Sequence, residues 1–380
     1  MKIIADENIP LLDKLFGVIG EVVRFPGREI DANCLGDAEI LLVRSVTKVN
    51  QQLLEGSHIR FVGTCTIGTD HIDEAYLQSR GIAFASAPAC NANSVVEYVL
   101  SCLCLISESG GRPLEKLTVG IVGAGNVGGR LAERLQRMGI RCLINDPPRA
   151  DAGATGMVSL DEIMSADVIS LHTPLTFDGD HPTYHLFDAA RIESLKSGQV
   201  LINTGRGAVV DNAALLQKLN SDPFSCAILD VWEGEPEISI ELAKKVMIAT
   251  PHIAGYSLEG KANGSEQIYQ ALCQHVGLPG RYGAAQFLPE PFLTKMTFSS
   301  QASPEKALFS AIRAVYDVRS DHLKTLNALT CAPVNVSEQF DYLRKDYPVR
   351  REFSSLKVQL KSCDGDVLRR LKSAGFNIKQ

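Results

Sequence analysis

Short, continuously apolar runs recur along the chain, and segments with helical periodicity separate them. In the middle of the sequence they lie at Ala166–Leu171, Gln199–Asn203, Ala227–Leu229 and Val246–Ala249. Strands that are buried on both faces of a parallel sheet have this pattern. Each run ends in polar or glycine-rich residues. Because ligands of open parallel sheets lie outside the carboxyl ends of the strands, we expect the functional residues at these ends.

The two ends of the chain follow related patterns. Residues 1–97 contain further predicted strands, and Ser94–Ser107 is predicted to be a helix that crosses between lobes. The early strands are expected at Lys2–Ala5, Val22–Phe25, Ile40–Val43, Ile59–Gly63 and Ile82–Ala85. In the tail, apolar positions from Ala307 to Val318 have helical spacing, and Leu356–Leu360 alternates as a half-buried strand does. A helix at Asp366–Ser373 and a strand at Phe376–Ile378 complete a predicted small α/β module.

A glycine-rich motif, VGIVGAGNVGGR, begins within the apolar run that starts at Leu117. Gly123, Gly125 and Gly128 have the spacing of a dinucleotide fingerprint, and Arg130–Met138 has the periodicity of a helix. The first glycine allows a tight turn, the second lets a pyrophosphate approach the backbone, and the third lets helix and strand pack closely. The phosphates then lie at the positive end of the helix. A glycine turn in an ordinary α/β domain is the alternative interpretation.

Asp146 follows the next predicted strand, Arg141–Ile144, about 20 residues beyond the glycines. An acidic side chain there accepts hydrogen bonds from ribose hydroxyls and repels a 2′-phosphate, so the sequence favours NAD over NADP. A solvated loop carboxylate is the alternative for Asp146 taken alone. Its pairing with the fingerprint favours the ribose ligand.

Three residues downstream are suited to one reaction. Arg206 lies in INTGRGAVVD, Glu235 in ILDVWEGEPE and His252 in TPHIAGY. A guanidinium binds a carboxylate through two hydrogen bonds and keeps its charge. An imidazole exchanges protons near neutral pH, and a carboxylate on its other nitrogen orients it. The three residues predict the oxidation of a hydroxyl group beside a carboxylate, with His252 as the acid/base.

Each of these residues also has a less specific interpretation. A lone arginine is usually a surface charge, a glutamate in a Gly-Glu-Pro turn usually faces solvent, and one histidine among eight is more often structural. Their positions after successive predicted strands, behind a dinucleotide motif, favour catalysis. The other histidines that we considered lack matching partners and are predicted to be structural, namely His71, His172, His181 and His185. No metal site is predicted.

The chain resembles the D-isomer-specific 2-hydroxyacid dehydrogenases in VGIVGAGNVGGRLAERL, HTPLT, NTGRGAVVD, LDVWEGEP and TPHIAG. The resemblance implies the roles given above for Arg206, Glu235 and His252. It also implies that the cofactor, NAD, contacts residues beyond the fingerprint glycines. These are Asn126, Val127, Asp146, Thr173, Asp230 and Gly255.

The resemblance also implies an α/β fold in which the first domain is discontinuous. We expect a flavodoxin-like substrate domain at residues 1–97 and 257–285, completed by a helix at Gly260–Val276. A Rossmann-type doubly wound parallel-sheet domain is expected at residues 98–256, and a small C-terminal α/β domain at residues 286–380. The active site is expected in the cleft between the first two domains.

The segments MKIIADENIP, LLVRSVTKVN, FVGTCTIGTDHID and NANSVVEYVL resemble a narrower group within the family. In that group the substrate carries a carboxylate at one end and a phosphate at the other, and the C-terminal domain forms a homodimer. The resemblance implies that Ser45, Thr66 and Tyr256 contact the substrate. Arg44, beside Ser45, is a candidate ligand for the phosphate, because cations bind a dianion in a cleft. A turn that caps a helix beginning near His71 is the alternative for Thr66.

The charge of the tail differs from that of the rest. Residues 281–380 hold 16 Lys and Arg against 10 Asp and Glu, although the whole chain has a net charge of −6. The tail therefore offers further candidate ligands for the substrate phosphate. These are Arg350 and Arg351, near Arg344-Lys345 in a predicted loop, and they could bind the phosphate in the active site of a partner subunit. A solvated charged surface is the alternative.

The composition bounds the class of protein. With 45% apolar and 22% charged residues the chain is typical of globular proteins, and a pI near 5.8 without a basic stripe argues against nucleic-acid binding. We expect no membrane segment, and the ten cysteines without a CxxC pair predict reduced thiols in the cytoplasm. Two other functions remain open. A dehydrogenase of 3-phosphoglycerate, glycerate or hydroxypyruvate would use the same three residues, and an NAD-sensing binding protein can retain them without turnover.

Overall fold

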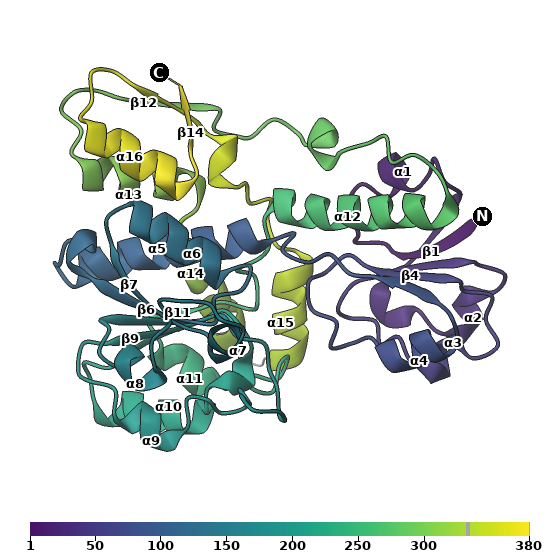
Figure 1. The fold of residues 1–380 in the computed structure, drawn as a ribbon, viewed down its shortest axis with the longest axis horizontal. Helices are drawn as coiled ribbons and strands as arrows, with labels where there is room; N and C mark the ends of the chain where they lie inside the picture. The colour runs from purple at the N-terminus through teal and green to yellow at the C-terminus, as the bar shows by residue number, and fades with distance from the viewer. Residues whose placement is uncertain (332–334, 380) are drawn as a thin grey trace. The chain divides into compact units, whose positions relative to one another are not determined.

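The computed structural model describes residues 1–331 and 335–379, which form two compact units. The first unit comprises Met1–Ala92 and Tyr256–Glu290, and the second comprises Asn93–Gly255 and Pro291–Gln380. Figure 1 shows the secondary structure of both. The C-terminal segment is thus grouped with the central residues. The division into three domains, with residues 286–380 separate, remains a prediction.

A five-stranded parallel sheet forms the centre of the first unit, in the order β2-β1-β3-β4-β5. This is the flavodoxin-like order of a doubly wound sheet. The strands are β1 (Lys2–Asp6), β2 (Glu21–Phe25), β3 (Ile40–Val43), β4 (Phe61–Thr64) and β5 (Ala83–Ala85). The helices are α1 (Leu12–Leu15), α2 (Ala32–Leu35), α3 (Gln51–Leu54), α4 (Glu74–Ser79) and α12 (Leu258–Val276), with 3-10 turns η1 (Gly27–Glu29) and η4 (Ala284–Phe287).

Successive side chains of these strands enter different cores. Ile3 packs in a cluster with residues of α1 and α12, whereas Ile4 packs in a cluster with residues of α2, α3 and α4. Leu41 and Leu42 divide in the same way. Alternate residues of a strand point to opposite faces, so a sheet covered on both sides requires an unbroken apolar run. This requirement explains the pattern in the sequence.

The second unit is built on a six-stranded parallel sheet in the order β11-β10-β9-β8-β6-β7. Its strands are β6 (Thr118–Val122), β7 (Arg141–Asn145), β8 (Val168–Leu171), β9 (Val200–Asn203), β10 (Cys226–Leu229) and β11 (Ile248–Ala249). Its helices before residue 256 are α5 (Ala92–Ser109), α6 (Gly128–Arg137), α7 (Pro147–Asp151), α8 (Leu160–Ile163), α9 (Ala189–Glu193), α10 (Asn212–Ser221) and α11 (Ile240–Lys245), with η2 (Leu114–Lys116) and η3 (Gly207–Val209). The strand order reverses direction between β6 and β8, which is where doubly wound sheets bind ligands.

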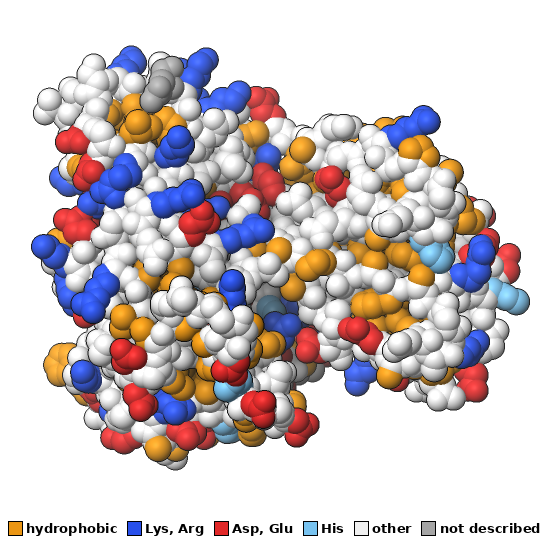
Figure 2. Space-filling view, in the orientation of Figure 1, with side chains coloured by type: hydrophobic (Ala, Val, Ile, Leu, Met, Phe, Trp, Pro, Cys, Tyr) orange, Lys and Arg blue, Asp and Glu red, His pale blue; other side chains and the backbone are white. Residues whose placement is uncertain are grey.

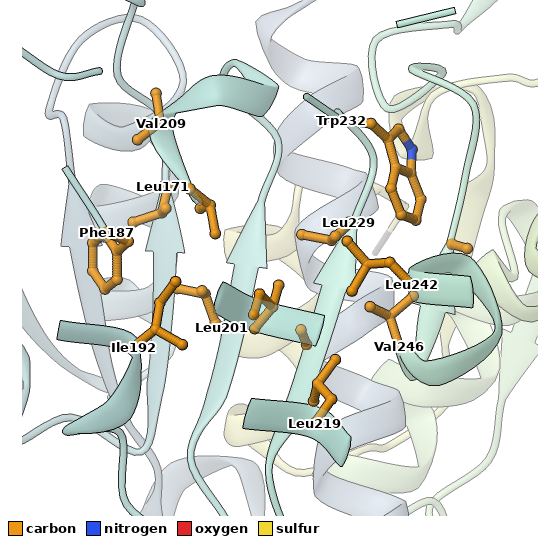
Figure 3. Packing of buried hydrophobic residues seen from close by; sticks show 14 of the residues in the cluster. Leu171, Phe187, Ile192, Leu201, Val209, Leu219, Leu229, Trp232, Leu242 and Val246 are labelled. Atoms are coloured by element: carbon orange, nitrogen blue, oxygen red, sulfur yellow. The ribbon is translucent and has the colours of Figure 1, made fainter. Parts of the chain in front are cut away.

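One face of this sheet is packed by apolar side chains from α9, α10 and α11. Figure 3 shows Leu171, Leu201 and Leu229, which come from neighbouring strands, facing Ile192 and Leu219 of the covering helices. Trp232, just beyond β10, closes the same cluster near the carboxyl ends of the strands. The core therefore extends to the edge of the sheet that carries the predicted active site.

Within residues 291–331 and 335–379, the tail adds a small parallel sheet and four helices to the second unit. The sheet has the order β12-β13-β14 and consists of β12 (Lys295–Phe298), β13 (Lys357–Leu360) and β14 (Asn377–Lys379). The helices are α13 (Pro304–Val315), α14 (Val318–Thr330), α15 (Val336–Lys345) and α16 (Gly365–Ala374), with η5 at Phe353–Ser355. Figure 2 shows more Lys and Arg than Asp and Glu over α16 and α13.

Three predicted boundaries in this unit are wrong. The helical pattern from Ala307 to Val318 covers two helices, because Asp317 caps a new helix by accepting a hydrogen bond from the Arg319 backbone N–H. Arg344 and Lys345 end α15 and do not lie in a loop. Of the run Val246–Ala249, only Ile248–Ala249 is strand.

Among residues 1–331 and 335–379, none of the helices combines the length and the apolar character that crossing a bilayer requires.

Candidate active site

Arg206, Glu235 and His252 lie beyond the carboxyl ends of three neighbouring strands. They follow β9, β10 and β11, which are adjacent in the sheet. All three residues line one pocket of about 210 Å³, together with parts of the segments 207–208 and 231–234. The structure therefore brings together a cation, an imidazole and a carboxylate that are separated by up to 46 positions in the sequence.

Glu235 and His252 form a hydrogen-bonded pair. Nδ1 of His252 lies 2.7 Å from Oε2 of Glu235, and Oε1 of Glu235 accepts a hydrogen bond from the Trp232 backbone N–H at 2.8 Å. Burial opposes ionisation of this carboxyl group, but the neighbouring His252 and the two hydrogen bonds lower the pKa of Glu235 below its ordinary value. An ionised Glu235 holds the proton on Nδ1, so Nε2 is the nitrogen that can exchange a proton with a ligand.

The backbone around His252 is anchored by the buried Asp230. His252 has a positive φ of 58°, and its N–H donates to the carbonyl of Asp230 at 2.7 Å. The carboxylate of Asp230 accepts hydrogen bonds from the N–H groups of Ile253 (2.8 Å) and Ala254 (2.9 Å) and from the hydroxyl of Thr250 (2.6 Å). Burial raises the pKa of Asp230. Asp230 thus supports the catalytic segment, and its predicted contact with the cofactor remains a prediction.

Arg206 is held by a residue that the sequence analysis did not select. The Asn203 side chain donates to the Arg206 carbonyl at 2.9 Å and accepts from the Gly205 N–H at 3.0 Å. Nη1 of Arg206 donates to the Gly205 carbonyl at 3.0 Å. The position of Asn203, as the last residue of a buried strand, was the only local signal of this role.

The fingerprint forms the expected strand, turn and helix. Gly123 has a φ of +87°, and a Cβ atom there would lie 2.9 Å from the His172 carbonyl carbon. A Cβ on Gly128, at the start of α6, would collide with the Gly123 carbonyl oxygen. Oδ2 of Asp146 accepts a hydrogen bond from the Ala124 N–H at 2.7 Å, so the carboxylate lies against the glycine turn. Arg149, also missed from sequence, donates to the Ala124 carbonyl from the other side.

These residues fit a dinucleotide. Nothing lies within 4 Å of the position of a Cβ on Gly125, which leaves room for a pyrophosphate beside the turn. Oγ1 of Thr173 is buried and has no hydrogen-bond partner among the described residues, and the Thr173 backbone lies beside Gly123. A buried hydroxyl without a partner is costly unless a ligand supplies one. Asn126, Val127 and Gly255 remain predicted contacts.

Three of the four predicted substrate residues of the first unit have partners within that unit. Nε of Arg44 donates to Oδ2 of the buried Asp6 at 2.9 Å, and Ser45 is exposed. The hydroxyl of Thr66 lies 2.8 Å from that of Thr64. The ammonium group of Lys261 lies 4.3 Å from the centre of the Tyr256 ring. The contacts of Arg44, Ser45, Thr66 and Tyr256 with a substrate remain predictions.

The histidines predicted to be structural lie in local hydrogen-bond networks. His172 bridges Ser170 (2.9 Å) and Thr204 (3.0 Å), and burial lowers its pKa to about 3. His71 lies 3.0 Å from the Thr64 hydroxyl, and burial lowers its pKa to about 4. His181 pairs with Asp151 and His185 with Glu233. His185, Asp211 and Glu233 lie close together, and we assign no metal to them.

The interpretation of Arg350 as a phosphate ligand is wrong. Its residue surface is only 5% exposed, and its guanidinium donates to the backbone carbonyls of Ser94 and Ala254. A cation committed in this way is not available to an anion from solvent.

The parallel-sheet fold and the Arg-Glu-His pocket define an NAD-binding dehydrogenase of 2-hydroxy acids. In agreement, the family model described as "D-isomer specific 2-hydroxyacid dehydrogenase, NAD binding domain" matches residues 106–254. A model for a domain of unknown function matches residues 287–372. The chain belongs to the erythronate-4-phosphate dehydrogenase family. It is 52% identical to the erythronate-4-phosphate dehydrogenase of Marinobacter nauticus, over 100% of both chains, and 50% identical to that of Hahella chejuensis, over 100% of this chain and 99% of the relative.

Solved structures share the fold of about three quarters of the chain. The D-lactate dehydrogenase of Aquifex aeolicus, complexed with NAD and lactic acid, is 28% identical with a TM-score of 0.59 and covers 73% of this chain and 96% of its own. The NAD+-bound 3-phosphoglycerate dehydrogenase of Entamoeba histolytica is 25% identical with a TM-score of 0.61 and covers 73% and 95%. These matches agree with NAD as the cofactor.

Proposed function

We propose that this protein oxidises 4-phospho-D-erythronate to 3-hydroxy-2-oxo-4-phosphooxybutanoate with NAD, as a step in pyridoxal 5′-phosphate synthesis. The single structural observation that carries the redox role is the shared pocket of Arg206, Glu235 and His252. The sequence of this chain is 50–52% identical, over its full length, to relatives named erythronate-4-phosphate dehydrogenase, and this similarity supports the choice of substrate.

The residues of the pocket divide the reaction between them. Arg206 binds the substrate carboxylate and stabilises the charge that develops on the neighbouring oxygen. Nε2 of His252 removes the proton of the C2 hydroxyl, while Glu235 keeps the Nδ1 proton and stabilises the imidazolium that forms. NAD, when bound, accepts the hydride from C2. In the reverse direction His252 returns the proton to the carbonyl oxygen.

We propose that residues of the first unit recognise the rest of the substrate. Ser45 and Thr66 follow β3 and β4, so they lie at the carboxyl ends of strands, where a doubly wound sheet binds ligands. Tyr256 follows the catalytic segment directly in the chain. Arg44 is the proposed phosphate ligand. Its Nε bonds to Asp6, which orients the guanidinium and leaves the two terminal nitrogens to bind an anion.

A substrate panel tests the proposal. NADH formation should be fastest with 4-phosphoerythronate, compared with erythronate, 3-phosphoglycerate and glycerate. The variant Arg44→Ala should reduce the preference for 4-phosphoerythronate over erythronate at least tenfold in kcat/KM. Arg60→Ala should not, because Arg60 directly precedes β4, at its amino end, and pairs with Glu39. A higher kcat/KM for another acid would assign a different dehydrogenase. Tight NAD binding without turnover of any acid would instead favour a sensor.

We also propose that the protein is a homodimer formed through residues 286–380. Large apolar side chains of the tail are exposed, including Phe292, Leu323, Tyr342 and Val349. Where such side chains form one contiguous patch, they mark an interface. A molar mass of one chain from light scattering would contradict the dimer.

The ten cysteines are all free, which favours a reducing compartment such as the cytoplasm.

A further inference from the structure

A cation from the C-terminal segment lies buried beside the catalytic segment. Arg350 belongs to the stretch between α15 and η5, in which Arg351 and Glu352 follow it. Only 5% of the Arg350 surface is exposed. Burying a guanidinium costs free energy unless several partners satisfy it, so its partners indicate what it does.

The Arg350 guanidinium donates to two backbone carbonyls from distant parts of the chain, and it also interacts with the Tyr347 side chain. Its buried Nε has no hydrogen-bond partner among the described residues. Nη1 donates to the Ala254 carbonyl at 3.1 Å, and Nη2 donates to the Ser94 carbonyl at 2.7 Å. The Ser94 hydroxyl also donates to the Ala254 carbonyl, at 2.9 Å. The planar guanidinium therefore bridges two segments that are 160 residues apart in the sequence.

These two carbonyls lie close in sequence to the points where the chain passes between the two units, and that of Ala254 is also close to the catalytic His252. Ala254 is two residues beyond His252, and its N–H is already held by Asp230. The chain passes between the two compact units after Ala92 and again after Gly255, so Ser94 and Ala254 each lie within two residues of a crossing. Asp230 holds the catalytic segment by its N–H groups, and Arg350 holds the same segment by a carbonyl.

The surroundings of Arg350 balance its charge. Its guanidinium carbon lies 3.6 Å from the centre of the Tyr316 ring, which is a cation–π geometry. The acids that act on it are Asp321 and the buried Glu97, whose Oε1 accepts the Phe353 N–H at 2.9 Å. Burial raises the pKa of Glu97, and Arg350 opposes that rise. Tyr316 and Asp321 are themselves residues of the tail, so the tail supplies the cation and part of its environment.

We propose that Arg350 is a positioning residue, through which the C-terminal segment fixes the backbone that carries His252. The guanidinium does not touch the substrate. It acts by holding the carbonyls of Ala254 and Ser94 at one point, so that the imidazole stays aligned with Glu235. The tail is then a part of the catalytic support.

The variant Arg350→Lys tests this role. An ammonium group keeps the charge that the acids require, but it lacks the planar fork that bonds two carbonyls at once. Arg370→Lys is the matched control, because Arg370 is also a tail arginine, is 7% exposed, and pairs with Glu115 rather than with the catalytic segment. The kinetic arm rests on the proposed function, so amide hydrogen exchange of residues 252–255 is measured as well.

Arg350→Lys should lower kcat about tenfold or more with little change in the KM for NAD, because a small displacement of a catalytic group has effects of this size. Exchange at residues 252–255 should become faster. Arg370→Lys should change neither, even if it lowers the melting temperature as much. Equal kcat and equal exchange in the two variants would overturn the proposal.

The experiment also distinguishes two further outcomes, an inactive wild-type protein and a variant that does not fold. If the wild-type protein oxidises no 2-hydroxy acid, the proposed function fails, and the exchange data alone decide the role of Arg350. If Arg350→Lys does not fold, Arg350→Gln takes its place, because its side-chain amide still donates hydrogen bonds but lacks the fork that bonds two carbonyls at once. Wild-type kcat and wild-type exchange in Arg350→Gln would then reject the proposal.

Discussion

Two glutamates of the same turn have different partners, and the partners indicate different roles. One glutamate orients the catalytic histidine, whereas the other contacts a histidine that is predicted to be structural. Glu235 is bonded to Nδ1 of His252, whereas Glu233, two positions earlier, is bonded to His185 and lies beside the Asn212 N–H. Both line the pocket. The lowered pKa of Glu235 means that its carboxylate is ionised throughout the range in which an imidazole titrates.

Replacing Glu235 by Gln should lower kcat at least about tenfold, because the neutral amide no longer stabilises the imidazolium and does not select its tautomer. The KM for NAD should change little. Steady-state kinetics with NAD and 4-phosphoerythronate provide the measurement. Glu233→Gln is the control and should have a much smaller effect. Similar losses in the two variants would show that the turn acts as a whole and that Glu235 has no special role.

At the scale of the elements, polar side chains lie together at the ends of the parallel strands, where they form hydrogen bonds with one another. His172 follows β8 and bridges Ser170 of the same strand to Thr204, which follows β9. The imidazole is therefore a buried neutral connector between neighbouring strand ends. Its pKa of about 3 lies well below the ordinary 6.5, so the folded state disfavours its protonation.

This shift predicts a dependence of stability on pH. Between about pH 6.5 and pH 3 the unfolded chain binds a proton at His172 and the folded chain does not, so protonation favours unfolding as the pH falls. Each pH unit in this window should remove about 1.4 kcal/mol of the free energy of unfolding for this one group. Urea unfolding at pH 7 and pH 5 should show a smaller pH dependence for His172→Gln. His181→Gln, at a more exposed site, should leave it unchanged; equal slopes in all three proteins would refute this assignment.

At the scale of the whole molecule, the tail and the central residues share one core. Leu329 of α14 and Phe340 of α15 belong to the same buried cluster as Leu229 and Trp232. At the other end of the tail, α16 packs against α6, and Arg134 donates to the Ala374 carbonyl at 2.8 Å. Apolar contacts that cross from one segment to another make the two unfold together.

Phe340→Ala should therefore destabilise the NAD-binding sheet as well as the tail. The side chain is fully buried, so its loss should lower the free energy of unfolding by about 3–5 kcal/mol. Thermal unfolding followed both by circular dichroism and by loss of NADH binding should give one coincident transition. Tyr342→Ala, on the same helix but 58% exposed, is the control. A tail that unfolds separately, with NADH binding retained, would contradict the shared core.

Much of the fold follows from local patterns in the sequence. Each apolar run overlaps a strand, although the ends differ by one or two residues, since a strand buried on both faces has no polar side. The glycine spacing predicts the turn before α6. The helix prediction was wrong where a cap interrupts a continuous apolar pattern, as Asp317 does between α13 and α14. Arg206, Glu235 and His252 could be selected because each follows a predicted strand.

The sequence by itself determined which strands form, where the dinucleotide turn lies, and which three residues can carry out a redox reaction, because strand periodicity and glycine spacing act over neighbouring residues. Only the tertiary structure decided which groups hold those residues in place. Asn203 supports Arg206, Asp230 supports the segment around His252, and Arg350 reaches that segment from almost 100 positions away. Such contacts depend on the packing of distant segments, and no local pattern encodes the partner of a buried guanidinium.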